Sequence, residues 1–541
     1  MAWAKKILRV NLSKGTCASE PLNMEWAQQY LGQRGLATKY LVAETDPKVD
    51  PLSPDNKLIM TTGPLTGTPA STGGRYSVVT KGALTNAIAC SNSGGYFGAE
   101  LKFAGWDMII FEGKSPKPVY LSIENDKAEL KDASHLWGTT TWHTEETIKK
   151  AHQDPQVRVC SIGRAGENGV LYACIVNDLH RAAGRSGVGT VMGSKNLKAV
   201  AIRGTLGTSS IKDPKAFMAA AAAGKKVLAE NAVTGQGLPT YGTNVLTNVI
   251  NEAGAYPTKN FMWGRFDGCS KISGETQAET ENARGGEGSA THGCHRGCVI
   301  RCSGTYVDKD GQFVSKQPEY ETVWAHGPNC GIDDLDAIAA LDRLDDDFGL
   351  DTIEMGATIA VAMEAGLAKF GDAQAAIKMV KEVGKGTPLG RILGSGAAVT
   401  GRVFGVERVP VVKGQAMPAY DPRSLKGIGV TYAMSPMGAD HTAGNALETA
   451  RSHDPLSRDG QVAVSLRLQI RAAILDSLGV CLFFRPVFVK NPQLSAALLN
   501  ARHGWSWSFA DVRVMGVECL RAESEFNRRG GVSEEQCDVP E

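Results

Sequence analysis

The chain has 541 residues, a formal net charge of +1 and 42% hydrophobic residues. This length suits two to four domains with large cores, and the balanced charge gives no general argument for nucleic acid or an anionic membrane as a partner. The N-terminus is too polar for a signal peptide, and no run of about 18 apolar residues predicts a membrane-spanning helix. The 12 cysteines mostly lie singly, so the sequence predicts a reducing, cytoplasmic environment rather than a disulfide framework.

Residues 1–208 are predicted to form a β-rich domain. Short apolar or alternating runs, separated by turn residues such as Lys14 and Gly15, are typical of strands. The predicted strands are residues 7–11, 57–62, 75–80, 108–113 and 119–124.

After residue 208 the apolar residues take up helical spacing. The sequence around residues 268–293 is rich in glycine, glutamate and threonine and is predicted to be a loop. The expected fold class is α+β, with a β-rich domain (1–208), a helical domain that carries three clustered cysteines (209–418) and a C-terminal helical domain (419–541). The predicted helices are residues 215–231, 333–348, 352–370 and 461–480.

Two glycine-rich stretches in the β-rich part are suited to a phosphorylated cofactor. The first comprises residues 63–69, 73–75 and 91–98, and the second runs from 180 to 195. Glycine lets backbone N–H groups come close to a ligand, and the arginines in both stretches can bind oxyanions. The second stretch matches neither a Walker A loop nor a dinucleotide-binding fingerprint. Turn-rich β structure is the alternative interpretation.

Three cysteines, Cys294, Cys298 and Cys302, follow a C-x3-C-x3-C pattern. This spacing lets three thiolates converge on one soft metal or iron–sulfur cluster. The fourth ligand need not be local, and Cys481 is the candidate. A cubane cluster suits one triplet with a distant cysteine better than zinc does, because zinc more often uses two C-x2-C pairs. Zinc and unliganded cysteines are the alternatives.

A short repeat, D-x-x-G-[LV]-[DC], occurs at residues 346–351 and 476–481. Each copy closes a predicted helix, and each glycine can take the left-handed conformation of a helix C-cap. The first aspartate then lies in the last turn, where the helix dipole opposes a negative charge. The repeat is either two ordinary glycine caps or a pair of carboxylates that bind an external donor such as a heterocycle N–H. The second interpretation is favoured because one copy ends in Cys481.

Over nearly its whole length the chain resembles the tungsten-containing aldehyde:ferredoxin oxidoreductase family. The resemblance rests on many motifs in the same order. These are residues 63–68, 73–76, 92–105, 165–168, 180–185, 192–199 and 318–321, together with the cysteine triplet and both D-x-x-G motifs.

The resemblance implies a tungsten (or molybdenum) bis-molybdopterin cofactor, whose two pterins share a Mg²⁺ ion between their phosphates. It also implies a β domain under the pterins and two helical domains above them. By motif position, a [4Fe-4S] cluster would be held by Cys294, Cys298, Cys302 and Cys481. The residues that would contact the pterins or their phosphates are Arg75, Asn92, Gly94, Arg181, Ala182, Gly184, Arg185, Asp346, Leu350, Asp351, Asp476 and Val480.

The chain departs from the family pattern at four places. The common triplet is C-x2-C-x3-C, one residue shorter between the first two cysteines. A glutamate of an inter-subunit metal site in some members corresponds to Ala340, with Arg343 three residues on, so no such metal is expected. A pterin-contacting arginine corresponds to Met437, and the sequence ends at Glu541, short of the usual C-terminal extension.

The resemblance also implies the reaction, which is oxidation of aldehydes to carboxylic acids with water. Electrons would pass through the cluster to ferredoxin or to an iron–sulfur subunit, and a homodimer is compatible with the family. Glu321 would take a proton from the attacking water, and His441 would polarise the carbonyl oxygen. His326 is a rival acid or base, while His292 and His295 are expected to tune the cluster rather than ligate it.

Two other functions compete with aldehyde oxidation. In the first, the chain is the catalytic subunit of a tungsten-dependent reductase complex that acts on aromatic acyl thioesters or carboxylic acids. The presence of both Glu321 and His441 favours aldehyde oxidation over this alternative. The second is a non-enzymatic iron–sulfur carrier or scaffold, against which the paired arginine–glycine stretches argue.

Overall fold

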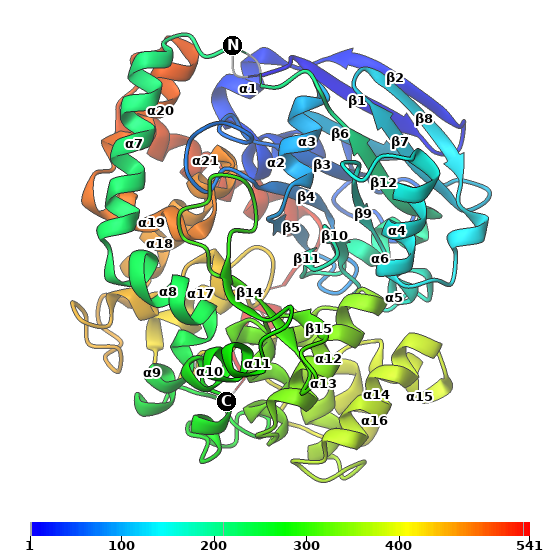
Figure 1. The fold of residues 1–541 in the computed structure, drawn as a ribbon, viewed down its shortest axis with the longest axis vertical. Helices are drawn as coiled ribbons and strands as arrows, with labels where there is room; N and C mark the ends of the chain where they lie inside the picture. Colours follow the sequence, from blue (N-terminus) through cyan, green and yellow to red (C-terminus); the bar gives the residue numbers. More distant parts are fainter. Residues whose placement is uncertain (1–2, 209, 534, 541) are drawn as a thin grey trace.

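The computed structural model describes residues 3–208, 210–533 and 535–540 (Figure 1). Two β-sheets form a layer from the N-terminus to Arg203, and most of the later chain is helical. In Figure 1 the β layer lies at the upper right, the helices of the middle of the chain lie below it, and α7 (Pro214–Glu230) lies with the C-terminal helices at the left. The predicted α+β class, with a β-rich part before helical parts, is confirmed.

The two sheets have six strands each and follow the same pairing scheme. In each sheet the first two strands along the chain form a hairpin. The first strand of that hairpin pairs in parallel with the last strand of the same sheet, and all other neighbouring strands are antiparallel. Across the first sheet the order is β2 (Thr16–Pro21), β1 (Lys6–Asn11), β6 (Met108–Glu112), β3 (Leu58–Thr62), β4 (Tyr76–Lys81) and β5 (Ile88–Ser93). Across the second it is β11 (Arg181–Ala183), β10 (Ile175–Asn177), β9 (Arg158–Ser161), β12 (Leu197–Arg203), β7 (Val119–Glu124) and β8 (Lys127–Asp132).

The inner strands β3, β4 and β6 of the first sheet are buried on both faces. In β3, Ile59 belongs to a core shared with α2 (Gln33–Glu44), whereas Met60 belongs to the core between the two sheets. Successive residues of a strand face opposite sides, so a strand covered on both sides is apolar at nearly every position. The five predicted strands are confirmed as β1, β3, β4, β6 and β7.

The two sheets meet at their edge strands β5 and β11, which contact each other. Asn92 lies on β5 and Ala182 lies on β11. The two glycine-rich stretches are therefore brought together, although about 90 residues separate them in the chain. Their junction faces the helical part of the molecule and carries the candidate site.

The helical part also contains a three-stranded sheet of β13 (Ser289–His292), β14 (Ser303–Val307) and β15 (Phe313–Lys316). Besides α2 and α7, the helices before residue 270 are α1 (Met24–Tyr30), α3 (Phe97–Phe103), α4 (Thr141–His152), α5 (Arg164–Glu167), α6 (Val188–Ser194), α8 (Leu238–Tyr241) and α9 (Leu246–Glu252). The helices that follow residue 270 are α10 (Gly274–Arg284), α11 (Tyr320–His326), α12 (Leu335–Phe348), α13 (Thr352–Glu364), α14 (Ala373–Lys385), α15 (Pro388–Leu393), α16 (Ala397–Phe404), α17 (Lys426–Met434), α18 (Gln461–Leu478), α19 (Arg485–Lys490), α20 (Gln493–His503) and α21 (Phe509–Arg529).

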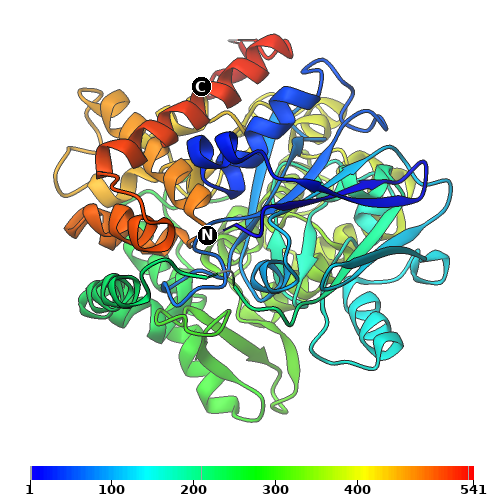
Figure 2. The same ribbon diagram turned by 90° about the horizontal axis from the view of Figure 1, so that it is seen from above.

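The last helices fasten the C-terminal part to the β layer. Helix α21 packs against α18 and α2, and Figure 2 shows it running beside the first helices of the chain. Arg34 of α2 is fully buried, with its Nε 2.7 Å from Glu523 of α21 and its Nη1 3.2 Å from Asp476 of α18.

None of the described helices is by itself long and apolar enough to cross a membrane; α18 and the segment Leu482–Lys490 reach that length and composition only together, as a pair bent by 111°.

Two sequence predictions are wrong in detail. Residues 268–293 are not one loop, because they contain α10 and β13. Helix α10 buries Gln277 and Glu281, which make hydrogen bonds, so it lacks the apolar period that predicts a helix. The helix predicted over 352–370 ends at Glu364, and Gly366 shortly after it has a φ of 85°.

Candidate active site and thiol cluster

The three clustered cysteines lie on the connection between β13 and β14, and Cys481 follows the C-terminus of α18. The Sγ atoms of Cys294 and Cys298 and a ring nitrogen of His295 lie within 4.8 Å of one another, a separation that one metal ion can span. The backbone N–H of Cys481 donates to the Thr72 carbonyl at 3.0 Å, which fixes this cysteine against the first glycine-rich stretch. A thiol set of this kind suits a soft metal or an iron–sulfur cluster.

Arg75 connects the thiols to the β layer. Its Nη2 donates to the Sγ of Cys481 at 3.0 Å, and its Nη1 donates to Oδ1 of Asn92 at 3.2 Å. A hydrogen bond from Cys298 lowers the pKa of Cys294, and nearby Arg181 and Arg75 act in the same direction against the effect of burial. Cys294 is thereby held towards the thiolate form that ligates metals.

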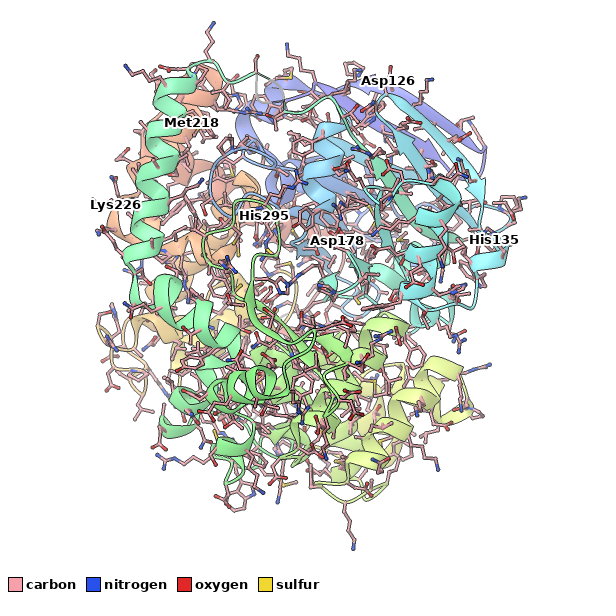
Figure 3. The ribbon with its side chains drawn as sticks, viewed as in Figure 1. Asp126, His135, Asp178, Met218, Lys226 and His295 are labelled. Atoms are coloured by element: carbon pink, nitrogen blue, oxygen red, sulfur yellow. The ribbon has the colours of Figure 1, made fainter. Side chains whose placement is uncertain are left out.

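His295 lies beside the cysteines between the β layer and the helical part, where Figure 3 labels it not far from Asp178. Its Nδ1 is 2.8 Å from the Arg296 carbonyl, and its Nε2 is buried without a hydrogen-bond partner among the described residues. The ring is therefore oriented by the backbone and presents one free nitrogen. Its closeness to Cys294 and Cys298 makes it a further possible ligand, in addition to the tuning role expected from the sequence.

Both D-x-x-G motifs close helices as predicted, with Gly349 and Gly479 in the left-handed conformation. The backbone of each motif packs closely against a glycine of the β layer. A Cβ atom at Gly63 would lie 2.5 Å from the Leu478 carbonyl oxygen, and one at Gly163 would lie 2.3 Å from the Phe348 carbonyl oxygen. The two sheets therefore resemble each other in their contacts as well as in their strand pairing, because each has a glycine against the C-terminus of a helix.

The carboxylates of the motifs are held by buried cations. One carboxylate oxygen of Asp476 accepts a hydrogen bond from the Arg34 guanidinium, and the other accepts one from the Asn92 side-chain amide at 3.3 Å. Asp346 pairs with Lys316, whose Nζ lies 2.8 Å from both Asp346 and Asp342. Each aspartate is fixed in direction before any ligand binds, which is what recognition of a rigid heterocycle requires.

The third carboxylate of the motifs, Asp351, caps α13 and receives the Nε of Arg185 at 3.0 Å. The remaining Arg185 donors go to the carbonyls of Ala439 and Ala416, at 2.7 and 2.9 Å. Arg185 therefore orients Asp351 and the loop before His441. Leu350 and Val480, the apolar members of the motifs, are buried.

Backbone is exposed to the site at two of the predicted glycines. A Cβ atom at Gly184 would meet no atom of the described chain within 4 Å, and the nearest atoms to one at Gly94 would be those of the Arg75 guanidinium and the Cys294 Sγ, at 3.5–3.7 Å. Arg181, at the start of β11, donates to Ser303 at 2.5 Å and lies 3.5 Å from Glu319. These stretches present N–H and C=O groups where glycine permits close approach.

The predicted acid–base pair is assembled by the fold. Glu321 lies in the first turn of α11, and its Oε2 accepts from the Ala419 N–H at 3.1 Å. Its Oε1 lies 3.5 Å from Nδ1 of His441, and neither atom has a hydrogen-bond partner among the described residues. Burial raises the pKa of Glu321, and His441 opposes that shift. A carboxyl group with a raised pKa beside an imidazole can accept and release protons near neutral pH.

Sequence reasoning missed the aromatic ring that holds His441. Tyr420 stacks on the imidazole with a centroid distance of 5.8 Å and an angle of 30°, and it also packs on Tyr320. The rival His326 is fully buried, with its Nε2 2.6 Å from Asp345, so it belongs to the ion network around Lys316. No motif marks Tyr420, Lys316 or Arg34, because their partners lie far away in the chain.

Two of the departures from the family pattern have local explanations. Met437 is buried, and its sulfur accepts the Cys90 N–H at 3.2 Å. Arg343 stacks on Trp142 at 3.9 Å and pairs with Asp347 at 3.1 Å. Both side chains are thus engaged within this chain.

The fold and the site define a redox enzyme, which combines thiols suited to a metal with a constrained carboxylate and imidazole. Residues 7–204 match the family model of the aldehyde ferredoxin oxidoreductase N-terminal domain, and residues 219–541 match that of domains 2 and 3. The chain belongs to the aldehyde ferredoxin oxidoreductase family.

Known proteins agree with this assignment. The tungsten-containing aldehyde ferredoxin oxidoreductase of Pyrococcus abyssi is 42% identical over 554 residues, with 98% of this chain and 89% of the relative covered. The aliphatic sulfonate oxidoreductase, WOR-like subunit, of Pyrococcus furiosus is 30% identical over 490 residues, with 82% and 76% covered. The solved active site complex BamBC of benzoyl coenzyme A reductase has a TM-score of 0.81 at 23% identity, covering 100% of this chain and 91% of that one, and shows a shared fold.

Proposed function

We propose that this enzyme oxidises aldehydes to carboxylic acids with water and passes the electrons to ferredoxin or to an iron–sulfur subunit. The observation that carries the proposal is the Glu321–His441 pair, with facing atoms that are buried and 3.5 Å apart. Relatives at 41–42% identity over 98% of this chain are named as tungsten-containing aldehyde ferredoxin oxidoreductases, which supports it.

The cofactors in this proposal are a tungsten bis-pterin, a [4Fe-4S] cluster and a Mg²⁺ ion between the pterin phosphates. The residues fit such groups, because the thiol set has the donor chemistry of a cluster and because Gly184 and Gly94 leave backbone open. When bound, the tungsten–pterin group would take two electrons from the substrate and the cluster would carry them onward one at a time. The cluster ligands would be Cys294, Cys298, Cys302 and Cys481, and the pterins would be held by Arg75, Asn92, Gly94, Arg181, Ala182, Gly184, Arg185, Asp346, Leu350, Asp351, Asp476 and Val480.

The chain's own acid–base groups account for the proton transfers. An aldehyde and one water molecule give a carboxylate, three protons and two electrons, so protons must leave the site in every turnover. The Nδ1 of His441 faces Glu321, which leaves Nε2 to donate a hydrogen bond to the carbonyl oxygen. Glu321 takes a proton from the attacking water. Tyr420 keeps the imidazole plane fixed during these steps.

We also propose that the enzyme works in the cytoplasm. The unpaired cysteines fit a reducing cytoplasm. A homodimer of this chain would have no shared metal site at Ala340, because alanine offers no ligand atom. Arg343, three residues on, contacts Trp142 and Asp347 of its own chain.

The test is metal analysis of anaerobically purified protein, followed by a viologen-linked assay with simple aldehydes. We expect about one tungsten and about four irons per chain, and dye reduction that depends on the aldehyde. Molybdenum in place of tungsten would change the metal and keep the reaction. Zinc alone, in protein from a host that supplies tungsten, iron and pterin, would overturn the redox assignment.

A further inference from the structure

An apolar groove of about 670 Å³ runs between α18 and α21 on the outside of the molecule. Figure 2 shows α21, in red, at the upper edge of the fold. The apolar side chains that line the groove are Leu466, Ile470, Val517 and Leu520. Leu466 is 54% exposed, and Val462 and Val514, one helical turn before Leu466 and Val517, are 69% and 60% exposed. Contiguous exposed apolar side chains of this kind mark a surface that another molecule covers.

The exposed face of α21 beside the groove carries a stripe of charges. Its members are Asp511, Glu518, Arg521, Glu525 and Arg528, and the steps between them are seven, three, four and three residues, which places them on one side of the helix. Within the chain Arg521 pairs with Glu518 at 2.8 Å and Arg528 pairs with Glu525 at 2.7 Å. Both pairs are exposed and lie within one turn, so each contributes little and can be shared with another molecule.

The stripe is complementary to its own reverse. If a second copy of α21 lies antiparallel across the first, centred near the midpoint of the helix, Arg521 of each copy faces Glu518 of the other copy. In the same arrangement Arg528 of each copy faces Asp511 of the other. A contact in which one patch meets the same patch of a second copy is the geometry of a two-fold dimer.

The remaining charges of the face agree with this orientation. Arg513 lines the groove and makes no ion pair within the part of the chain that the structure describes. In the antiparallel arrangement it comes near Glu525 of the other copy, which is as far beyond the midpoint as Arg513 is before it. A parallel arrangement would place Arg521 against Arg521 of the other copy, and like charges repel. The charges therefore select the antiparallel pair.

The size of this face suits a weak dimer. Helix α21 has 21 residues, which gives a length of about 30 Å, and two packed helices are about 20 Å wide. The face therefore measures roughly 600 Å² per copy and roughly 1,200 Å² in total, the low end for a specific interface. An apolar centre with a charged rim is also the usual anatomy of such an interface.

We propose that the α18–α21 face is a two-fold interface with a second copy of this chain, in which the antiparallel α21 helices exchange ion pairs beside the apolar groove. The contact lies on the C-terminal helices, away from Ala340 on α12, and it does not depend on the proposed aldehyde oxidation. Because the area is small and the ion pairs are exposed, we expect a Kd of about 1–100 µM that rises with salt concentration.

The test reverses the charges at the centre of the interface. Arg521→Glu and Glu518→Arg each place like charges across the two-fold axis, so sedimentation equilibrium of the holoenzyme should show Kd raised by about tenfold or more in each variant. In an equimolar mixture of the two variants every reversed side chain faces an opposite charge again. Mixed dimers should therefore form with a Kd within about threefold of the wild-type value.

The control reverses a charge of the same kind elsewhere on the surface. Lys226, labelled in Figure 3, forms an exposed pair with Glu230 on α7. Lys226→Glu should dimerise like the wild type. Leu466→Asp tests the apolar part of the interface and should raise Kd by about tenfold or more, because the exposed side chain can be changed without disturbing the core.

Three results would overturn the proposal. A wild-type holoenzyme that stays monomeric at about 100 µM would exclude self-association of the expected strength and leave the groove to a different protein. A dimer that neither charge reversal weakens would place the interface on another face. A mixture of the two variants that does not recover mixed dimers would show that Arg521 and Glu518 do not face each other across the axis.

Discussion

The Nδ1 atom of His441 and the Oε1 atom of Glu321 lie 3.5 Å apart, slightly too far for a good hydrogen bond, and both are buried. A shift of a few tenths of an ångström would let the two atoms share a proton directly, and a water molecule beside both of them could bond to each. We expect Glu321→Gln to lower kcat/KM for aldehydes by about 100-fold or more, since the amide keeps the shape of the side chain and cannot accept the proton. Retention of more than about a tenth of the wild-type kcat/KM would exclude Glu321 as the base.

His441 should also set the pH at which Glu321 works. Burial raises the pKa of Glu321 and the neighbouring imidazole lowers it again, so His441→Gln should raise the pKa of Glu321 further. Since the base must be ionised, the acid limb of the kcat/KM profile should move to higher pH in His441→Gln, in addition to the loss of rate. An acid limb that stays in place, or moves to lower pH, would contradict the pairing.

Cys481 should be required for the iron content of the protein. Its Sγ is fixed by Arg75, and serine at this position would not supply a thiolate ligand. We expect Cys481→Ser to lose iron and the electron paramagnetic resonance signal of the reduced cluster. Cys17→Ser is the matched control, because Cys17 lies on β2 at the edge of the first sheet opposite β5. Equal iron in both variants would mean that the fourth ligand is another group, with His295 the next candidate.

Glu281 should make stability depend on pH. It is buried on α10, where it accepts from Gln317 at 2.9 Å, and burial raises its pKa to about 8. Because the folded-state pKa exceeds the unfolded value, the free energy of unfolding should fall as pH rises from about 4.5 to about 8, by up to roughly 1.4 kcal/mol per pH unit. Glu281→Gln should remove this slope and be more stable than the wild type near pH 9.

Denaturant midpoints measured between pH 5 and pH 9 will check this dependence. Glu279→Gln, which changes an exposed glutamate of the same helix, should keep the wild-type slope. A wild type and a Glu281→Gln variant with parallel pH profiles would show that Glu281 is ionised in the folded protein.

Arg34 should be among the most sensitive positions for stability. It makes two hydrogen bonds to Glu523, at 2.7 and 2.8 Å, and both side chains are buried. Arg34→Met leaves a buried carboxylate unpaired, so we expect a loss of about 3–5 kcal/mol in the free energy of unfolding, and Arg34→Met with Glu523→Leu should recover most of it. Arg521→Met breaks the exposed pair with Glu518 and should cost less than about 1 kcal/mol.

The sequence was most informative where the chain is apolar or repetitive. Strands β1, β3, β4 and β6 of the first sheet and the caps at Gly349 and Gly479 were predicted because buried apolar runs and left-handed caps leave local signals, whereas β2 and β5 of the same sheet were not predicted. Helix α10 was missed because its buried face consists of amides and a carboxylate. The proposed site residues came mainly from the family resemblance, as spacing alone leaves the cysteines open to zinc as well as iron.

Long-range polar pairs could not be predicted at all. Arg34 and Glu523 are 489 positions apart, and neither neighbourhood differs from an ordinary amphipathic helix. Lys316 is equally plain in sequence, although it joins two aspartates around the first D-x-x-G motif. Such pairs depend on how sheets and helices stack, which hydrophobic periodicity does not specify.

The division of the thiol set between two regions of the chain has a consequence for biosynthesis. Cys302 leaves the ribosome roughly 180 residues before Cys481, a delay of about 10–35 s at ordinary elongation rates. During that time the triplet on the β13–β14 connection is without the partner that α18 delivers, and Arg34 is without Glu523. If these four cysteines hold the proposed cluster, its assembly would have to wait for a nearly finished polypeptide, and a chain interrupted before α18 would carry the triplet without its fourth ligand.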